Sequence, residues 1–418
     1  MTGDRKALLE QRLATLEPYP GGRFAGKGIV IPAGGPDLFT NAYVLIHLLR
    51  VVHGCRLPIE VWHFGSAEMS PRMQLLLREL AVEAVDAEAA LAAHPAAIAS
   101  GWPLKPYALM WSRFEEVLML DADQVPLRDP ADLFACDGFG ATGALLWPDV
   151  NDILAANPAW AACDLRPRAM PAIESGQIMI DKRRHWAALQ VALHLNEQAD
   201  YFYEFLYGDK DTWLLALLLA GEPYTLLQHR PFADVPFCLH QRDSAGNPLF
   251  QHRTGAKWRY AGAQVELPNA ALRDECLQAL ATLRRQWNGL VFNPPPRSAR
   301  ARAAEAQLAG IARFELIRPG ERTVALELLH AGEIGAGRAA DRMNWHCEES
   351  DGAVTLVIRD AFSPVWRFRP AADGRWDASS SGREAYLAPA DGRPAADQPA
   401  RPDWPVSGSY TADPEIEP

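Results

Sequence analysis

The chain has 418 residues, of which 49% are hydrophobic and 22% are charged. This composition is typical of globular proteins, so a wholly disordered chain is excluded, and the length favours two or three domains. The formal net charge of −11 at pH 7 argues against a protein that coats DNA or RNA, so we expect no nucleic acid among its partners.

The first 20 residues are charged and amphipathic, which predicts a helix. They lack the apolar core of a secretion signal. The longest apolar run, from Trp213 to Ala220, is too short to span a bilayer and is typical of a buried helix. The six cysteines form no C-x-x-C pair, which favours reduced, buried thiols over a zinc ribbon. We therefore expect a cytoplasmic protein with no transmembrane segment.

Strand and helix patterns alternate along the first part of the chain. A strand is predicted over residues 28–33 and a helix over 37–53, with Asp37 as its N-cap, before a second strand over 59–64. Further helices are expected over 105–115, 184–198, 209–219 and 276–288, and further strands over 117–120, 140–146 and 177–180. This order predicts an α/β fold with parallel strands joined by helices, which we assign to a first domain over residues 1–300.

The pattern changes after about Asn293. The run Pro294-Pro295-Pro296 and the Arg/Ala-rich residues 298–309 predict a linker or an exposed helix. Residues 311–388 contain short strands of period two and predict a small antiparallel β module. Its hairpin-turn signals are Asp351-Gly352 and Asp373-Gly374. Residues 389–418 are rich in Pro, Asp and Gly, and we expect a flexible tail there.

The most informative segment runs from Lys105 to Leu133 and sets an acidic pair directly after a strand. The strand ends in Asp121-Ala122-Asp123, and ligands of open α/β sheets bind at the carboxyl ends of strands. Two carboxylates at this spacing can converge on Mg²⁺ or Mn²⁺, which can in turn bridge a nucleotide diphosphate. An isolated D-x-D is more often an acidic turn, but the helix and strand before it favour a cation site.

Six pieces of the sequence, in this order, resemble GT-A-fold glycosyltransferases. They are GIVIPAGG (28–35), LPIEVWHFG (57–65), the segment from K-P-Y-A-L to D-A-D (105–123), ESGQIMIDK (174–182), GDKDTW (208–213) and FQHRTGAKW (250–258). The chain most closely resembles the fungal-type α-mannosyltransferase family, and more distantly glycogenin-like enzymes. The resemblance implies a GT-A-like domain that binds a nucleotide sugar, a retaining transfer, and GDP-mannose as the first expected donor, with a UDP-sugar as the second.

The same resemblance implies roles for single residues. Asp121 would contact the donor ribose and the metal, Asp123 and His252 would bind the metal, and Lys257 would steady the donor phosphates. A neutral histidine nitrogen suits Mn²⁺ better than Mg²⁺, so we expect Mn²⁺ first and Mg²⁺ second. Taken alone, a histidine such as His252 is more often a surface loop residue, and His240 is a competing candidate for the metal ligand.

Other residues are candidates for the substrate site. Asp209 and Asp211 begin an apolar helix, so one can cap it while the other faces the sugar or the acceptor hydroxyl, and we favour Asp211 for the site. Glu174 and Gln177 are candidate hydroxyl partners, although a junction between a loop and a strand explains them equally well. Gly176 between them would allow the backbone to approach a sugar closely.

Candidates for donor binding lie after the first strand and around the D-x-D. Ala33 and Gly34 follow the first strand, at the edge where a nucleotide-sugar fold holds the base and the ribose. The segment lacks G-x-G-x-x-G, so a dinucleotide is not expected. Ala122 lies between the two aspartates, and Lys105 either reaches the diphosphate or is simply solvated.

Two rival functions stay open. Residues 117–125, VLMLDADQV, also match the first motif of haloacid-dehalogenase-like phosphatases, in which Asp121 would be the phosphorylated nucleophile and Asp123 a general acid. That motif normally opens its fold, whereas a long α/β pattern precedes it here. In a non-catalytic glycan-binding protein, tryptophans of the C-terminal module would stack on sugars, although they more often fill a small β core. These tryptophans are Trp345, Trp366 and Trp376.

We interpret the chain as a metal-dependent enzyme that moves a mannose-type sugar from a nucleotide sugar to a hydroxyl of a glycan or glycoconjugate. Catalysis would be mainly electrostatic and positional. The Ala/Arg-rich usage suggests a bacterial enzyme.

Overall fold

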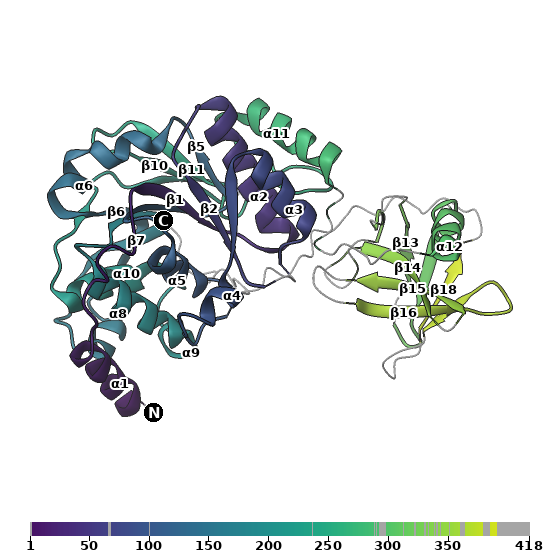
Figure 1. Cartoon of the computed structure of the whole chain (residues 1–418), viewed down its shortest axis with the longest axis horizontal. Helices are drawn as coiled ribbons and strands as arrows, with labels where there is room; N and C mark the ends of the chain where they lie inside the picture. Colours follow the sequence, from purple (N-terminus) through teal and green to yellow (C-terminus); the bar gives the residue numbers. More distant parts are fainter. Residues whose placement is uncertain are drawn as a thin grey trace. The chain divides into compact units, whose positions relative to one another are not determined.

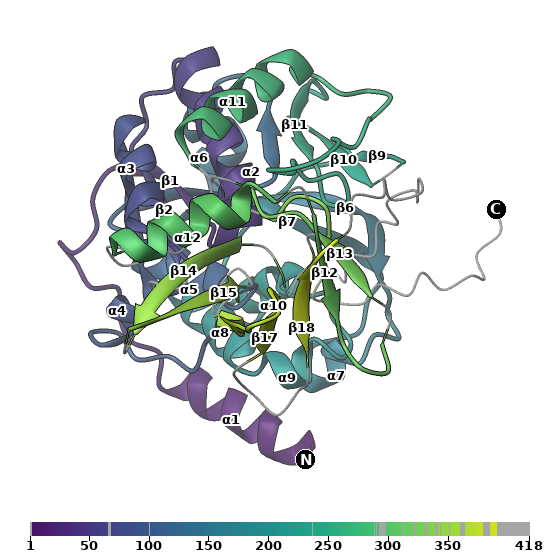
Figure 2. The same ribbon diagram turned by 90° about the vertical axis from the view of Figure 1, so that its right-hand side faces the viewer.

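The structure, a computed structural model, divides the chain into two compact units, residues 1–291 and 292–418 (Figures 1 and 2). The residues that it describes are 2–65, 68–99, 101–235, 237–287, 289, 291, 298–311, 313–321, 323–329, 332, 334–337, 339, 342, 344–350, 352–359, 364–378 and 385–390. The run Pro294-Pro295-Pro296, the turn residue Asp351 and residues 391–418 of the predicted tail lie outside this set.

The first unit is built around a seven-stranded sheet with the order β3-β2-β1-β4-β7-β6-β8. Its strands are β1 (Lys27–Pro32), β2 (Ile59–His63), β3 (Val82–Asp86), β4 (Glu116–Leu120), β6 (Ala144–Ile153), β7 (Met170–Asp181) and β8 (Thr225–Leu226). Strands β1 to β4 are parallel, as predicted, whereas β7 runs antiparallel to β4 and β6. The carboxyl ends of β1 to β4 therefore meet at one edge of the sheet.

Helices cover both faces of this sheet (Figure 1). One face packs against α5 (Leu104–Trp111), α8 (Trp186–Glu197) and α10 (Lys210–Ala220), and the other against α2 (Gly35–His47) and α3 (Pro71–Glu79). A π-helical turn, Leu48–Val52, extends α2, and α11 (Arg273–Gln286) packs on α2. The other helices are α1 (Thr2–Ala14), α4 (Ala87–Leu91), α6 (Asp137–Thr142), α7 (Ala159–Ala162), α9 (Ala199–Phe202) and the 3-10 helix Pro130–Ala135. Coverage on both sides explains why β1 and β4 are continuous apolar runs, and the predicted α/β class is confirmed.

Several predicted boundaries are shifted, among them that of the strand expected over 177–180, which begins at Met170. The N-cap of α2 is Gly34, so Asp37 lies within the first turn instead of capping the helix. The helix expected over 105–115 ends at Trp111, because Ser112 adopts an extended backbone with ψ of 154°. The strand expected from residue 140 begins only at Ala144, because α6 occupies the preceding residues and ends at Gly143, whose φ of +78° favours glycine.

A second, antiparallel sheet of four strands, β5-β11-β10-β9, is not anticipated by the sequence patterns. Its strands are β5 (Gln124–Pro126), β9 (Phe232–Asp234), β10 (Cys238–Arg242) and β11 (Pro248–His252). Strand β5 begins directly after Asp123, so the chain passes from the main sheet to the second sheet through the aspartate pair. With only three residues, β5 is too short to produce a recognisable period-two pattern.

The second unit contains an antiparallel sheet with the order β13-β12-β18-β17-β16-β15-β14, and the predicted β module is confirmed. Its elements are α12 (Ala299–Ala309), β12 (Phe314–Ile317), β13 (Val324–Leu326), β14 (Asn344–Ser350), β15 (Ala353–Arg359), β16 (Pro364–Pro370), β17 (Trp376–Ala378) and β18 (Tyr386–Pro389). The Arg/Ala-rich segment is therefore a helix, and it packs its Ala301 and Leu308 against the sheet.

The tryptophans of the second unit mostly fill its apolar core, as the structural alternative to glycan stacking predicts. Trp345 and Trp366 are buried in its apolar core and present no open face to a sugar, and Trp376 is partly buried against the same core. The six cysteines form no disulfide bonds with one another, and five of them are buried. Within the described part of the chain, we find no helix with the length and hydrophobicity needed to cross a bilayer.

Candidate functional site

The turn between β4 and β5 carries the aspartate pair at the carboxyl edge of the main sheet. The backbone N–H of Asp121 donates to the carbonyl oxygen of Gly176 in β7 at 2.8 Å, and the N–H of Arg253 donates to the carbonyl oxygen of Asp123 at 3.1 Å. Both ends of the turn are therefore pinned by backbone hydrogen bonds to other strands and loops, which fixes the direction of the two carboxylates.

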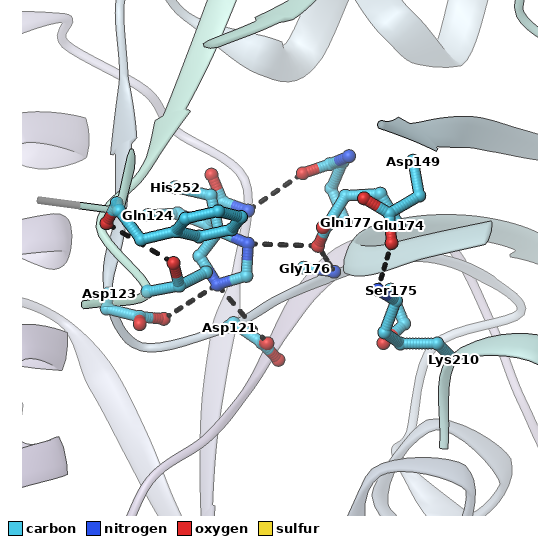
Figure 3. Close-up of polar contacts among 12 residues, drawn as sticks. Asp121, Asp123, Gln124, Asp149, Glu174, Ser175, Gly176, Gln177, Lys210 and His252 are labelled. Carbon is cyan, nitrogen blue, oxygen red and sulfur yellow. Dashed lines mark hydrogen bonds and ion pairs between the residues drawn. The ribbon is translucent and has the colours of Figure 1, made fainter. Parts of the chain in front are cut away.

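His252, the last residue of β11, lies beside the aspartates because β11 pairs with β5 in a register that sets it opposite Gln124. Its Nε2 lies 3.2 Å from Oδ1 of Asp123 and 3.6 Å from Oδ2 of Asp121 (Figure 3). One ligand atom from each of the three residues lies within 4.8 Å of the others. Carboxylate oxygens and an imidazole nitrogen at these separations fit a divalent cation such as Mn²⁺.

Glu174 orients the His252 ring from the opposite side, as Figure 3 shows. Its Oε1 lies 2.9 Å from Nδ1 of His252 and accepts the backbone N–H of Gly176 at 2.7 Å. A proton on Nδ1 leaves Nε2 directed at the aspartates, which is the arrangement of metal-binding histidines. Burial lowers the pKa of His252, but the carboxylates of Asp123 and Glu174 outweigh it and raise the pKa to about 10. A cation would replace the proton at Nε2.

Gly176 leaves the room that this arrangement needs. A Cβ at this position would lie 2.4 Å from Nε2 of Gln124 and 2.5 Å from Nδ1 of His252, closer than van der Waals contact permits. Two side chains therefore account for this glycine without a sugar, and the approach of its backbone to a sugar stays a prediction. Gly176 admits the imidazole ring of His252 to the edge of β7.

Lys105 and Asp209 face Asp121 from the helical side. Nζ of Lys105 in α5 lies 2.8 Å from Oδ1 of Asp121 and 3.2 Å from Oδ1 of Asp209, so this lysine is buried between two carboxylates and is not solvated. Asp209 makes no capping hydrogen bond to α10, and its Oδ2 instead accepts Nε1–H of Trp213 at 3.0 Å. Burial lowers the pKa of Lys105, but Asp121 and Asp209 outweigh burial and raise it, so the lysine stays charged.

Lys257 faces Asp123 from the loop after β11. Its Nζ forms an ion pair with Oδ2 of Asp123 and donates to the carbonyl oxygen of Thr254 at 3.0 Å. Burial raises the pKa of Asp123, but Lys257 and His252 outweigh burial and hold the pKa well below the usual range. At Asp121 burial dominates and the pKa is raised. Asp123 is therefore the more firmly ionised member of the pair.

Two charged residues of this region are missed by the sequence analysis, Asp149 in β6 and Lys210 at the start of α10. They form an ion pair with each other (Figure 3). Burial lowers the pKa of Lys210, but the nearby carboxylates of Glu174 and Asp149 outweigh it and raise the pKa. Their sequence signals are weak, because one is an aspartate within an apolar strand and the other is a lysine between two acids of GDKDTW.

The charges gathered around the turn are mostly negative. The acids are Asp121, Asp123, Asp149, Glu174, Asp209 and Asp211, and the bases are Lys105, Lys210, Lys257 and His252. With His252 neutral, six carboxylates against three lysines leave a formal excess of three negative charges. Negative charge in excess of its partners is costly to bury, so this donor set fits a divalent cation.

Asp211 and Gln177 lie at the edge of this network. Oδ1 of Asp211 accepts the backbone N–H of Ile173 in β7 at 2.9 Å, and burial raises the pKa of Asp211 to about 6. Oε1 of Gln177 accepts Nε2–H of Gln124 at 2.7 Å. Oε1 of Gln124 and Nε2 of Gln177 are buried and have no hydrogen-bond partner among the described residues. The two amides thus keep polar atoms that a ligand hydroxyl could satisfy.

Ala33 and Gly34 follow β1 at the same sheet edge as Asp121, because β1 and β4 are parallel neighbours. A Cβ on Gly34 would lie 2.0 Å from Oε2 of Glu68, so the glutamate side chain explains the glycine without a ligand. Ala122 is buried within the turn itself. These donor-binding roles stay predictions.

His240 lies outside the Asp121, Asp123 and His252 group. Its Nε2 pairs with Oδ2 of Asp234 at 2.8 Å, and its ring stacks on Phe232 with centroids 4.0 Å apart. Together with Gln251, whose Nε2 lies 3.3 Å from Nδ1 of His240, these partners account for His240. The side-chain partners of His252 come instead from the turn between β4 and β5 and from strand β7.

Comparison with known proteins identifies relatives of the first unit. Residues 26–157 and 164–239 match the model of a family described as "Mannosyltransferase putative". The alpha-1,2-mannosyltransferase MNN21 of Candida albicans is 29% identical over 265 residues, and the match covers 50% of this chain and 40% of that protein. The alpha-1,2-mannosyltransferase MNN2 of Saccharomyces cerevisiae is 26% identical over 269 residues, and the match covers 53% of this chain and 44% of that protein. The predicted resemblance to fungal-type α-mannosyltransferases is confirmed, and the match spans less than half the length of these relatives.

The solved structure of the mannosyltransferase Ktr4p from Saccharomyces cerevisiae is also similar, with a TM-score of 0.33 and 10% identity over 52% of this chain and 74% of that chain. A score this low carries no argument, and the fold assignment above rests on the strand order.

The expected bacterial origin is contradicted. The relatives come from Candida albicans and Saccharomyces cerevisiae, and both organisms are fungi. The expectation failed because Ala/Arg-rich usage is a property of composition and carries no information about which family a chain matches.

Proposed function

We propose, on the premise that residues 26–157 and 164–239 belong to the mannosyltransferase family, that this protein transfers a mannosyl group from a nucleotide sugar to a hydroxyl of a glycan or glycoconjugate. The observation that carries the proposal is the group of Asp121, Asp123 and His252 at the carboxyl edge of the sheet, with Lys257 beside it. In the transfer, the bond from the anomeric carbon to the diphosphate oxygen breaks, a bond to the acceptor oxygen forms, and the proton of the acceptor hydroxyl passes to the departing diphosphate. Negative charge grows on the departing diphosphate, so fixed positive charge next to it lowers the barrier.

Asp121, Asp123 and His252 would hold Mn²⁺ or Mg²⁺, and the imidazole ligand favours Mn²⁺. When bound, the cation supplies positive charge to the diphosphate. Glu174 holds the proton on Nδ1 of His252 and thereby keeps Nε2 available as a ligand. Lys257 is 40% exposed and is paired with a single carboxylate, so it can turn from Asp123 to a phosphate oxygen of the donor.

For the donor, we propose GDP-mannose first and a UDP-sugar second, with the base and ribose along the edge formed by Ala33, Gly34 and the turn of Asp121 and Ala122. We propose a retaining transfer that gives an α-linked product, by analogy with relatives named as alpha-1,2-mannosyltransferases. The cytoplasmic setting stays a prediction.

The remaining candidates divide into positioning residues and a hydroxyl partner. Lys105 would act by fixing the Asp121 carboxylate, and Asp209 would act by holding Lys105 from its other side in the same buried cluster. Asp211 would act by holding the backbone of β7 at Ile173. Gln177, with a buried amide nitrogen lacking a partner among the described residues, is the proposed partner for a sugar hydroxyl.

Thermal unfolding with GDP or UDP, each with and without Mn²⁺, tests the proposal. A nucleotide at about 100 times its dissociation constant should add about 2.7 kcal/mol to the free energy of unfolding. Asp123→Asn should lose the Mn²⁺-dependent part of the stabilisation, whereas Asp164→Asn, an exposed aspartate paired with Lys6, should keep it. An unchanged response of Asp123→Asn would contradict the metal assignment. A wild-type chain that responds to neither nucleotide would contradict the proposed function.

The phosphatase alternative predicts a different result. With Asp121 as a phosphorylated nucleophile, beryllium fluoride would form a stable adduct at that carboxylate and nucleoside diphosphates would have no effect. We favour the transferase because the family match, over residues 26–157 and 164–239, extends far on both sides of the aspartate pair in the sequence.

A further inference from the structure

Two exposed aromatic side chains lie in the segments that lead into α5 and α10. Trp102 precedes α5 and is 40% exposed, and Tyr207 precedes α10 and is 51% exposed. Their ring centroids are 6.3 Å apart and the ring planes are inclined by 39°. Most large aromatic side chains of the first unit are buried, so neighbouring exposed rings call for an explanation.

The Trp102 ring is held in place by the backbone beneath it. Gly208 has φ of +64°, and a Cβ there would lie 2.7 Å from Cε3 and 2.8 Å from Cδ2 of Trp102. The Gly208 backbone therefore covers part of the indole. Tyr203 packs its ring edge-on against Trp102 with centroids 5.8 Å apart. A ring supported in this way loses little conformational entropy when a ligand stacks on it.

Four consecutive residues connect these rings to the metal-ligand group. Gly208 contacts Trp102, and Asp209 pairs with Lys105, which binds Asp121. Nζ of Lys210 lies 4.8 Å from the Tyr207 ring centroid and pairs with Asp149. Asp211 holds the backbone of β7 just before Glu174, the residue that orients His252. The exposed rings therefore lie next to the proposed site, and residues 208–211 contact both the rings and the charged side chains of the site.

We propose that Trp102 and Tyr207 form a stacking platform for a pyranose ring of the acceptor glycan. This inference rests on the proposed function and identifies where its second substrate binds. The apolar C–H face of a hexose packs on an aromatic face, and its hydroxyl groups need charged or polar partners at the rim. Lys210, whose side chain is 18% exposed, supplies such a partner beside Tyr207, and the buried Asp149 holds it in place. The sugar-nucleotide base, by contrast, is expected at the edge of Ala33 and Gly34.

The test is calorimetric titration of an α-linked mannotriose into the full chain saturated with GDP and Mn²⁺. The variants are Trp102→Leu and Tyr207→Leu, with Tyr207→Phe retaining the ring. Phe232→Leu is the matched control, because Phe232 is 43% exposed on β9 and stacks on His240 instead. Thermal unfolding establishes that each variant is folded and reports its response to GDP with Mn²⁺.

Each leucine variant should weaken mannotriose binding by about tenfold or more, while Tyr207→Phe and Phe232→Leu stay within about twofold of wild type. The response to GDP with Mn²⁺ should be unchanged throughout. Unchanged mannotriose affinity in both leucine variants overturns the platform. Variants that lose GDP binding but keep mannotriose binding also overturn it, because the rings would then hold the nucleotide base. Wild-type protein that binds GDP with Mn²⁺ but no mannotriose overturns the platform and leaves the donor site standing. Failure of wild type to bind any nucleotide is failure of the proposed function itself.

Discussion

The two sides of the Asp121 to Asp123 turn each set a lysine against an aspartate, but they bury it to different degrees. On the helical side, the Lys105 side chain is 8% exposed and bridges Asp121 and Asp209. On the side of the second sheet, Lys257 is five times as exposed and pairs with Asp123 alone. If a buried lysine between two acids moves away, both carboxylates stay buried without a counter-charge. A more exposed lysine can exchange one anionic partner for another at a lower cost in free energy.

This difference separates a fixed half of the site from an exchangeable half. The helical side sets the direction of Asp121 through contacts that a ligand does not need to break. On the other side, Lys257 and the proton on His252 occupy places at Asp123 that a cation would take, and Lys257 would then be available to a diphosphate. Substitutions on the helical side should therefore act on stability, and those on the sheet side on ligand binding.

The largest effect is expected at Lys105. Lys105→Met should lower the free energy of unfolding by about 3–5 kcal/mol, because it leaves Asp121 and Asp209 buried without their cation. Lys257→Met, the matched substitution on the more exposed side, should cost clearly less, because the protonated His252 still pairs with Asp123. Chemical denaturation measures both. Equal losses in the two variants would remove the distinction between the two halves.

An intermediate effect is expected at Gly176, where the two halves meet. Gly176→Ala should cost about 1–3 kcal/mol, because its Cβ would press on Gln124 and His252. It should also reduce the Mn²⁺-dependent stabilisation by GDP, since His252 is pushed away from the aspartates. Gly140→Ala is the control, because a Cβ there meets open space in α6. A Gly176→Ala protein with wild-type stability and metal response would contradict this account of the His252 position.

The smallest effect is expected at Asp211 and depends on pH. Burial raises the pKa of Asp211 from 3.8 to about 6, although Lys210 acts to lower it. Between pH 3.8 and pH 6, the folded state therefore keeps a proton on Asp211 that the unfolded state has lost. Stability from this group is therefore complete below about pH 4 and is lost as the pH rises through 6. Asp211→Asn should be more stable than wild type at pH 7.5 by on the order of 1–2 kcal/mol. Denaturation at pH 4 and pH 7.5 measures this.

The outcome that would contradict the Asp211 prediction is a variant whose stability difference from wild type is the same at both pH values. In Asp211→Asn the backbone N–H of Ile173 can still donate to the side-chain amide oxygen, so the hydrogen bond itself is conserved in the comparison.

Local patterns were sufficient for the elements whose apolar periodicity is strong. Runs of apolar residues at regular spacing can bury their side chains in few other conformations. They predict the strand ending at Leu120, the helix over 186–197 and the antiparallel β module. The Asp121 and Asp123 pair was found because it directly follows such a strand. Short elements such as β5 were missed, because three residues contain too little pattern to be recognised.

The sequence by itself determined the alternation of strands and helices, the β module and the position of the acidic turn, since each depends on neighbours within a few residues. Only the tertiary structure decided which residues surround that turn. His252 reaches Asp123 through strand pairing between segments far apart in the chain, and Asp209 serves Lys105 instead of capping its own helix. Such partners are chosen by register and by the burial of charge, and these are properties of the assembled fold.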